Sequence, residues 1–139
     1  MLKKFVVCTL LVLGSQVGFA GSTAAPENAR AYIISPKDGE VVSSPVLIQF
    51  GLEGVGVAPA GVIWANTGHH HLLVDVDELP DLDKPVPTDE RHIHFGGGQT
   101  EVQLELEPGE HSLQLLLGDH VHIPHNPAVI SEKITITVE

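Results

Sequence analysis

Apolar and polar residues alternate along residues 101–107, where Val102, Leu104 and Leu106 are separated by acidic and amide side chains. A period of two residues is typical of an antiparallel strand with one face buried and the other in water. A helix would not sort these residues onto separate faces. We therefore expect the three apolar side chains to face a core and the intervening polar ones to face solvent.

Other short apolar segments have the length of strands, and no segment shows a convincing helical period. They lie at residues 31–34, 45–50, 62–64, 110–117 and 133–138. Several are bounded by turns such as Pro108-Gly109, where proline presets φ and glycine can adopt a positive φ. About seven short strands separated in this way predict an all-β fold, a single immunoglobulin-like antiparallel β-sandwich.

The N-terminal residues have the pattern of an export signal rather than of the fold. Residues 1–20 have two lysines at positions 3 and 4, continue with an apolar segment too short to span a bilayer, and end with the small residue Ala20. We predict a signal peptide over 1–20, a disordered leader over 21–29 and the β-sandwich domain over 30–139. The mature chain would then be periplasmic or secreted, with no part inserted in a membrane.

Charge and cysteine content narrow the possible partners. The formal net charge is −11 with neutral histidines, and removal of the two N-terminal lysines would make it more negative. This sign disfavours nucleic acids and favours cations or a basic protein partner. The only cysteine, Cys8, lies in the predicted signal peptide, so disulfides and thiolate ligands are excluded from the mature chain.

Histidines are concentrated in three short stretches. Eight of the nine occur within residues 69–71, 92–94 and 120–125. Neighbouring side chains of a strand point to opposite faces, so His69 and His71 should share one face, while His70 shares the other with Val76. A buried imidazole needs a hydrogen-bond partner or a metal ion.

We predict that the three stretches converge on one site for a divalent transition metal, copper or zinc, because imidazole suits both. The candidate ligands are His69, His70, His71, His94, His122 and His125, with His92 and His120 as further candidates. Asp75 and Asp119 are candidates to orient a ligating imidazole. His111 stands alone in a strand and is expected to be structural. No nucleotide or organic cofactor is indicated.

Two loops near these histidines have other possible interpretations. Residues 77–90 hold six carboxylates and three prolines, which would suit calcium, but the spacing of an EF-hand loop is absent and a solvated, proline-stiffened loop is favoured. Three glycines follow Phe95 and allow a sharp turn or a close approach of the backbone to another group. A phosphate-binding loop is excluded here, because no lysine or helix start follows in register.

Several motifs in fixed order resemble a bacterial family catalogued as domain of unknown function 4399 (DUF4399). They are His69 to Asp75, Phe95 to Glu101, Pro108 to Leu113 and Gly118 to Pro127. The resemblance covers roughly residues 45–138 and implies a small exported β-rich domain without an assigned activity. The histidines that match are His69, His70, His71, His94, His122 and His125.

Three functions remain open at this point. The first is a periplasmic metal-binding protein, and the second is a metal-free immunoglobulin-like module that binds a partner through its histidine-rich end. The third is a copper-dependent redox enzyme, because His120-Val121-His122 is similar to the copper-binding His-Val-His of copper–zinc superoxide dismutases. The cysteine pair of those enzymes is missing, and no hydrolase triad or zinc-protease signature occurs. No catalytic residue is therefore predicted.

Overall fold

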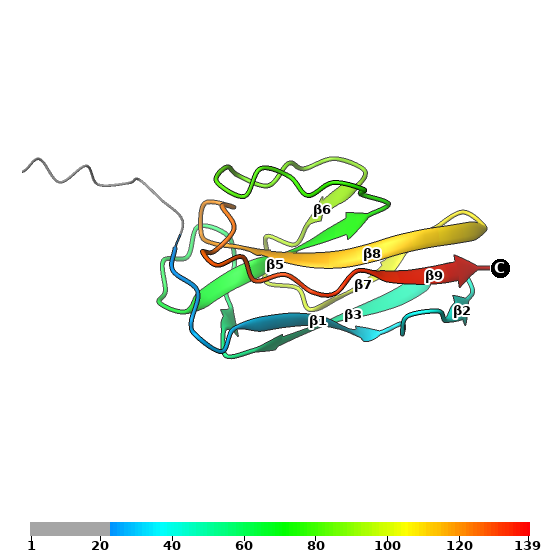
Figure 1. The fold of residues 1–139 in the computed structure, drawn as a ribbon, viewed down its shortest axis with the longest axis horizontal. Coiled ribbons are helices and arrows are strands. Elements are labelled where there is room, and N and C mark those ends of the chain that lie inside the picture. Colours follow the sequence, from blue (N-terminus) through cyan, green and yellow to red (C-terminus); the bar gives the residue numbers. More distant parts are fainter. Residues whose placement is uncertain (1–22) are drawn as a thin grey trace, which may run out of the picture.

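The computed structural model describes residues 23–139, which form nine β-strands and no helix (Figure 1). The strands are β1 (Arg30–Ser35), β2 (Val41–Val42), β3 (Val46–Glu53), β4 (Gly56–Val57), β5 (Thr67–Val74), β6 (His92–His94), β7 (Glu101–Leu104), β8 (Gly109–Gly118) and β9 (Ile134–Val138). This part of the chain accordingly contains no helix that could cross a membrane. The expected signal peptide lies outside the described residues.

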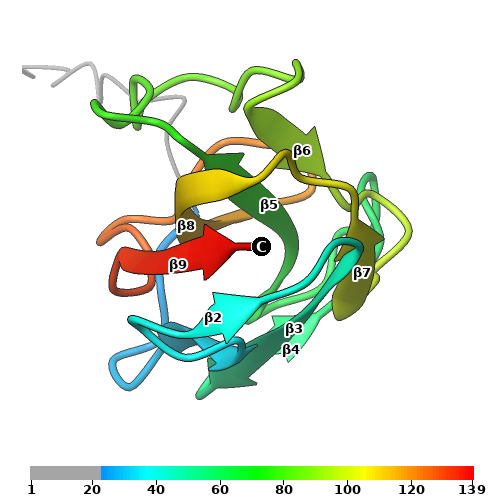
Figure 2. The same ribbon diagram turned by 90° about the vertical axis from the view of Figure 1, so that its right-hand side faces the viewer.

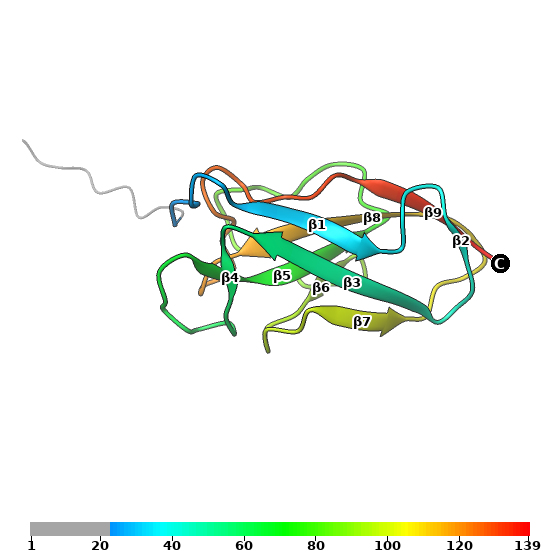
Figure 3. The same cartoon turned by 90° about the horizontal axis from the view of Figure 1, so that it is seen from below.

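Two sheets pack face to face (Figures 2 and 3). The smaller has the order β1-β3-β7, and the larger has the order β2-β9-β8-β5-β4, with β6 also paired to β5. Pairing is antiparallel except for the two-residue strands β2 and β4, which run parallel to β9 and β5. The sets β1-β3-β7 and β5-β8-β9 correspond to the A-B-E and C-F-G strands of immunoglobulin-like sandwiches. The predicted all-β sandwich is confirmed.

The core between the sheets follows the alternation seen in the sequence. Val102, Leu104 and Leu106 are half-buried and pack against it, while the polar residues between them are exposed. Residues 62–64, expected as a brief strand, instead lie in an exposed part of the loop between β4 and β5. The buried residues of this inner core are Ala31, Val46, Ile48, Phe50, Leu72, Val74, Phe95, Leu113, Leu115, Leu117, Val129, Ile136 and Val138.

A second, smaller core covers the outer face of the larger sheet. It joins Leu73 of β5 and Leu116 of β8 to Val76 and Val86. Val86 belongs to the acidic loop, residues 77–90, whose carboxylate side chains are all exposed. The loop is therefore solvated on one side and packed on the other, and β5 and β8 are buried on both faces. This explains the consecutive apolar residues 72–74 of β5 and 115–117 of β8.

Asp75 ends the alternation of β5. Its φ of 54° is left-handed, which reverses the direction of the next side chain. Val76 therefore packs in the outer core with Leu73, and the prediction that it shares a face with His70 is wrong. The Asp75 carboxylate supports this conformation by accepting a hydrogen bond of 2.9 Å from the Ser112 backbone amide.

Residues 23–29 differ from the disordered leader that was expected. Ala24 forms a parallel bridge with Asn126, and the Ala25 amide donates to the Asn126 carbonyl at 2.9 Å. The Thr23 hydroxyl donates to the Asp119 carboxylate at 2.8 Å. Composition alone did not reveal this order, because the partners lie about a hundred residues later in the chain.

His111 is structural, as expected. Its Nδ1 lies 2.8 Å from Oδ2 of Asp75 and its Nε2 lies 2.8 Å from the Glu107 carbonyl oxygen. Both ring nitrogens thus face acceptors, which favours the doubly protonated ring. Burial opposes protonation, but the hydrogen bonds to Asp75 and Glu107 and the charge of Asp75 outweigh it and raise the pKa of His111.

This pair predicts a pH-dependent stability. A raised folded-state pKa contributes stability that is fully present below about pH 6.5 and is lost as the pH rises through the folded-state pKa. We expect His111→Gln to lower the free energy of unfolding more at about pH 6 than at about pH 8.5. The difference should stay below about 1 kcal/mol, because the Asp75 side chain is 40% exposed. Urea unfolding at the two pH values measures it, and equal costs would show that the ring is not charged at pH 6.

Candidate metal centre

Five of the candidate ligands lie on the paired strands β5 and β6, and strand pairing brings three of them together. His69 and His71 project from β5 to the outer face of the larger sheet. His94 of β6 stands directly opposite His71 in the antiparallel register. Opposite residues of an antiparallel pair share a face, so strand pairing brings His94 to the two β5 histidines.

His122 reaches the same place from the loop that follows β8. Its φ of 69° is left-handed, a conformation that persists only where the surroundings hold it. Asp119 helps to stabilise this conformation, because its Oδ1 accepts hydrogen bonds of 3.0 Å from the backbone amides of Val121 and Ile123, on either side of His122. The Val86 amide, in the acidic loop, donates to the His122 carbonyl at 2.9 Å.

The four rings form a compact group. One potential ligand atom of each lies within 4.8 Å of those of the other three. Nε2 of His69 and Nδ1 of His122 are 3.0 Å apart, and the most distant ring centroids, those of His71 and His122, are 6.1 Å apart. A tetrahedral ion with bonds of 2.0–2.1 Å separates its ligand nitrogens by about 3.3 Å. The group can therefore hold a metal ion after small ring movements.

Half of the ring nitrogens of this group are buried without a hydrogen-bond partner among the described residues. His69 and His71 are buried, and His94 and His122 are half-buried. Nδ1 of His69, both ring nitrogens of His71 and Nε2 of His94 have no partner among residues 23–139. Each such buried nitrogen costs about 1–3 kcal/mol, and coordination of an ion would satisfy one nitrogen per ring.

Burial also keeps the rings in the form that binds metals. Burial first, and then the neighbouring imidazoles, lower the pKa of His69 to about 4 and that of His71 to about 3. Burial, followed by the proximity of His122, lowers the pKa of His94 as well. These three rings are consequently neutral near pH 7, and only neutral imidazole can coordinate a metal.

Two glycines make room for the rings. A Cβ added at Gly118 would lie 2.7 Å from Cε1 of His71, and one added at Gly96 would clash with Cε1 of His94. The expected close approach of the glycine segment after Phe95 is therefore made to an imidazole. Gly118 was not predicted to have a role, although a glycine that ends a strand beside a histidine stretch is a usable signal.

His70 lies on the opposite face of β5, inside the sandwich. Its ring centroid is 5.1 Å from that of Phe50, and both of its nitrogens lack partners among the described residues. The strand alternation that unites His69 and His71 directs His70 away from them, so the structure does not bring this candidate ligand into the group.

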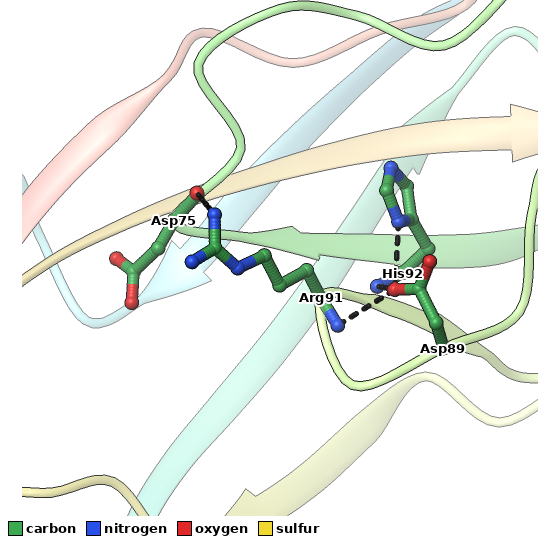
Figure 4. A network of polar contacts seen from close by, with 4 residues as sticks. All are labelled: Asp75, Asp89, Arg91 and His92. Atoms are coloured by element: carbon green, nitrogen blue, oxygen red, sulfur yellow. Dashed lines mark hydrogen bonds and ion pairs between the residues drawn. The ribbon is translucent and has the colours of Figure 1, made fainter.

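His125, His120 and His92 are also outside the group. Nε2 of His125 lies 3.2 Å from the Thr67 carbonyl oxygen. His92 shares the face of His94, but Figure 4 shows its ring turned to Asp89, with Nδ1 2.8 Å from the carboxylate. Of the eight candidate ligands, only His69, His71, His94 and His122 are brought together.

Neither candidate carboxylate accepts a hydrogen bond from a ligand ring. The Asp75 carboxylate accepts hydrogen bonds from the His111 ring and the Ser112 backbone amide. Its backbone carbonyl accepts a hydrogen bond from the Arg91 guanidinium (Figure 4). Asp119 bonds Thr23 and backbone amides instead. Burial raises the pKa of Asp119, but these hydrogen bonds outweigh it and the pKa is lowered overall. Its negative charge acts on His69 by opposing the fall in that ring's pKa.

The sequence profile of the family described as Domain of unknown function (DUF4399) matches residues 48–139. The matched span is more than half of the chain and includes all four histidines of the cluster. Comparison with curated proteins gave no match, and comparison with solved structures gave none either.

Proposed function

This chain belongs to the DUF4399 family, and we propose that it is an exported protein that binds one divalent transition metal ion, copper or zinc. The main observation behind this proposal is that His69, His71, His94 and His122 place potential ligand nitrogens within 4.8 Å of one another. An all-imidazole site without thiolates suits Cu(II) and Zn(II). The basic and apolar pattern of residues 1–20 supports function outside the cytoplasm.

The positions of the ligands support tight binding. Three come from strands whose pairing already sets their spacing, so little order must be gained when an ion binds. Four neutral ligands would leave a net charge of +2 at the ion. The buried carboxylate of Asp119, close enough to influence the pKa of His69, would offset part of it. The half-buried rings of His94 and His122 mark the side from which an ion would enter.

Calorimetric titration of Cu(II) and Zn(II) into untagged protein tests the proposal. We expect one ion per chain, and His71→Ala and His94→Ala should each weaken binding by more than about 100-fold, because each removes a ligand rather than an outer partner. His92→Ala is the matched control, on the same strand and face as His94 but outside the cluster, and should change affinity by less than about threefold. Equally weak binding in wild type and all variants would contradict the proposal.

A further inference from the structure

The loop before β5 presents an uncharged, apolar surface. Residues 54–68 contain no charged side chain, in a chain with 18 acidic and 7 basic residues. Within this stretch we call residues 58–66 the apolar loop. Its Ile63 and Trp64 are 81% and 74% exposed, and Trp64 is the only tryptophan of the chain. Exposed aromatic and apolar groups of this size are typical of interaction surfaces.

The apolar loop borders the open side of the histidine cluster. The Ala60 amide donates to the Gly96 carbonyl at 2.8 Å, and the Gly61 amide donates to the His120 carbonyl at 2.9 Å. Gly96 and His120 are each two residues from a half-buried ligand, His94 and His122 respectively. In Figure 1 the loop before β5 and the loop after β8 lie at the same end of the sandwich.

The acidic loop contacts His122 as well. Its Val86 amide bonds the His122 carbonyl, and its carboxylates point to solvent. The surroundings of the cluster therefore combine an uncharged apolar surface with an acidic one. Stable protein interfaces have this composition, with an aromatic anchor at the centre and charges that guide association at the rim.

We propose that the apolar and acidic loops together dock a basic metal-carrying protein that exchanges its ion with the cluster. The partner would offer an apolar pocket to Ile63 and Trp64, and lysines or arginines to the acidic loop. Charge complementarity selects this occupant, since the net charge of −11 would repel a second copy of the chain and an anionic lipid surface. The inference rests on metal binding at the four histidines.

The test uses two synthetic peptides. The first contains leucine and phenylalanine, several lysines and a histidine metal site. The second is identical except that glutamate replaces each lysine. Trp64 reports binding through its emission, without metal. We expect a blue shift with the lysine peptide only, and weaker binding at high salt. Ile63→Ser, which keeps the reporter, should weaken binding by about tenfold. Val41→Ser, 56% exposed on β2 at the other end of the sandwich, should not.

When the lysine peptide carries copper, stopped-flow absorbance should show transfer of the copper to the protein. Ile63→Ser should slow this transfer by about the same factor by which it weakens peptide binding. Affinity for free copper should be unchanged in this variant. Equal peptide binding by wild type and Ile63→Ser would overturn the docking proposal. A blue shift of the Trp64 emission with zwitterionic phosphatidylcholine vesicles would also overturn it, because the surface would then bind lipid. A blue shift that depends on protein concentration alone would overturn it too, because the surface would then bind a second copy of the chain. Peptide binding without any uptake of free copper would overturn the metal function instead and leave the docking surface intact.

Discussion

Cu(II) or Zn(II) at about a thousand times its dissociation constant is expected to raise the free energy of unfolding by about 4 kcal/mol. For a domain of this size the melting temperature should rise by more than about 10 °C. The reason is that the four histidines come from three separate segments and meet only in the folded chain. The ion therefore binds the folded state almost exclusively. Thermal unfolding with metal, and again after chelation, measures the effect.

His71→Ala should lose most of this metal-induced rise. The relevant quantity is the difference between the metal-loaded and chelated protein, because removal of a buried ring also changes the stability of the metal-free state. His92→Ala should retain the full rise, since its ring bonds Asp89 and lies outside the cluster. Identical melting temperatures for wild type with and without metal would count against the centre.

His70→Leu is expected to stabilise the metal-free protein by about 1–3 kcal/mol. The ring of His70 is fully buried between the sheets, and neither of its nitrogens has a hydrogen-bond partner among residues 23–139. Phe50 lies beside this ring, and Leu72, the next residue of β5 on the same face, belongs to the apolar core. Leucine has a similar volume and removes the unsatisfied polar atoms, a replacement that is typically neutral or stabilising. Chemical denaturation of both proteins after chelation measures the change.

The same substitution separates the two faces of β5. His70→Leu should leave affinity for Cu(II) or Zn(II) within about threefold of wild type, whereas His69→Leu, one residue away on the outer face, should weaken it by more than about 100-fold. A destabilised His70→Leu protein would mean that the imidazole has a partner in solution. Loss of metal affinity would return His70 to the set of ligands.

The strands and turns were predictable because their signals are local. The alternation at Val102, Leu104 and Leu106 specifies a half-buried strand wherever its partner lies, and Pro108-Gly109 marks a reversal from its own backbone preferences. The placement of His69 and His71 on one face, opposite His70, follows from the same period of two. These features require no knowledge of the rest of the chain.

The composition of the site could be predicted only in part. Histidine stretches identified all four cluster members among eight candidates, but not which four would meet. His94 joins the cluster because β6 pairs with β5 in one particular register. A shift by one residue would place Ile93 there instead. That register is selected by burial over the whole sheet and cannot be read from residues 92–94.

Sequence by itself determined the all-β class, the strand faces and the supply of imidazoles, because each depends on residues close together in the chain. Tertiary structure alone decided the left-handed conformation of His122 and the reversal at Asp75. It also decided that the acidic loop packs Val86 on the outer face of the sheet. These features depend on hydrogen bonds and apolar contacts between segments far apart in sequence, whose free energies arise only once the sandwich has formed.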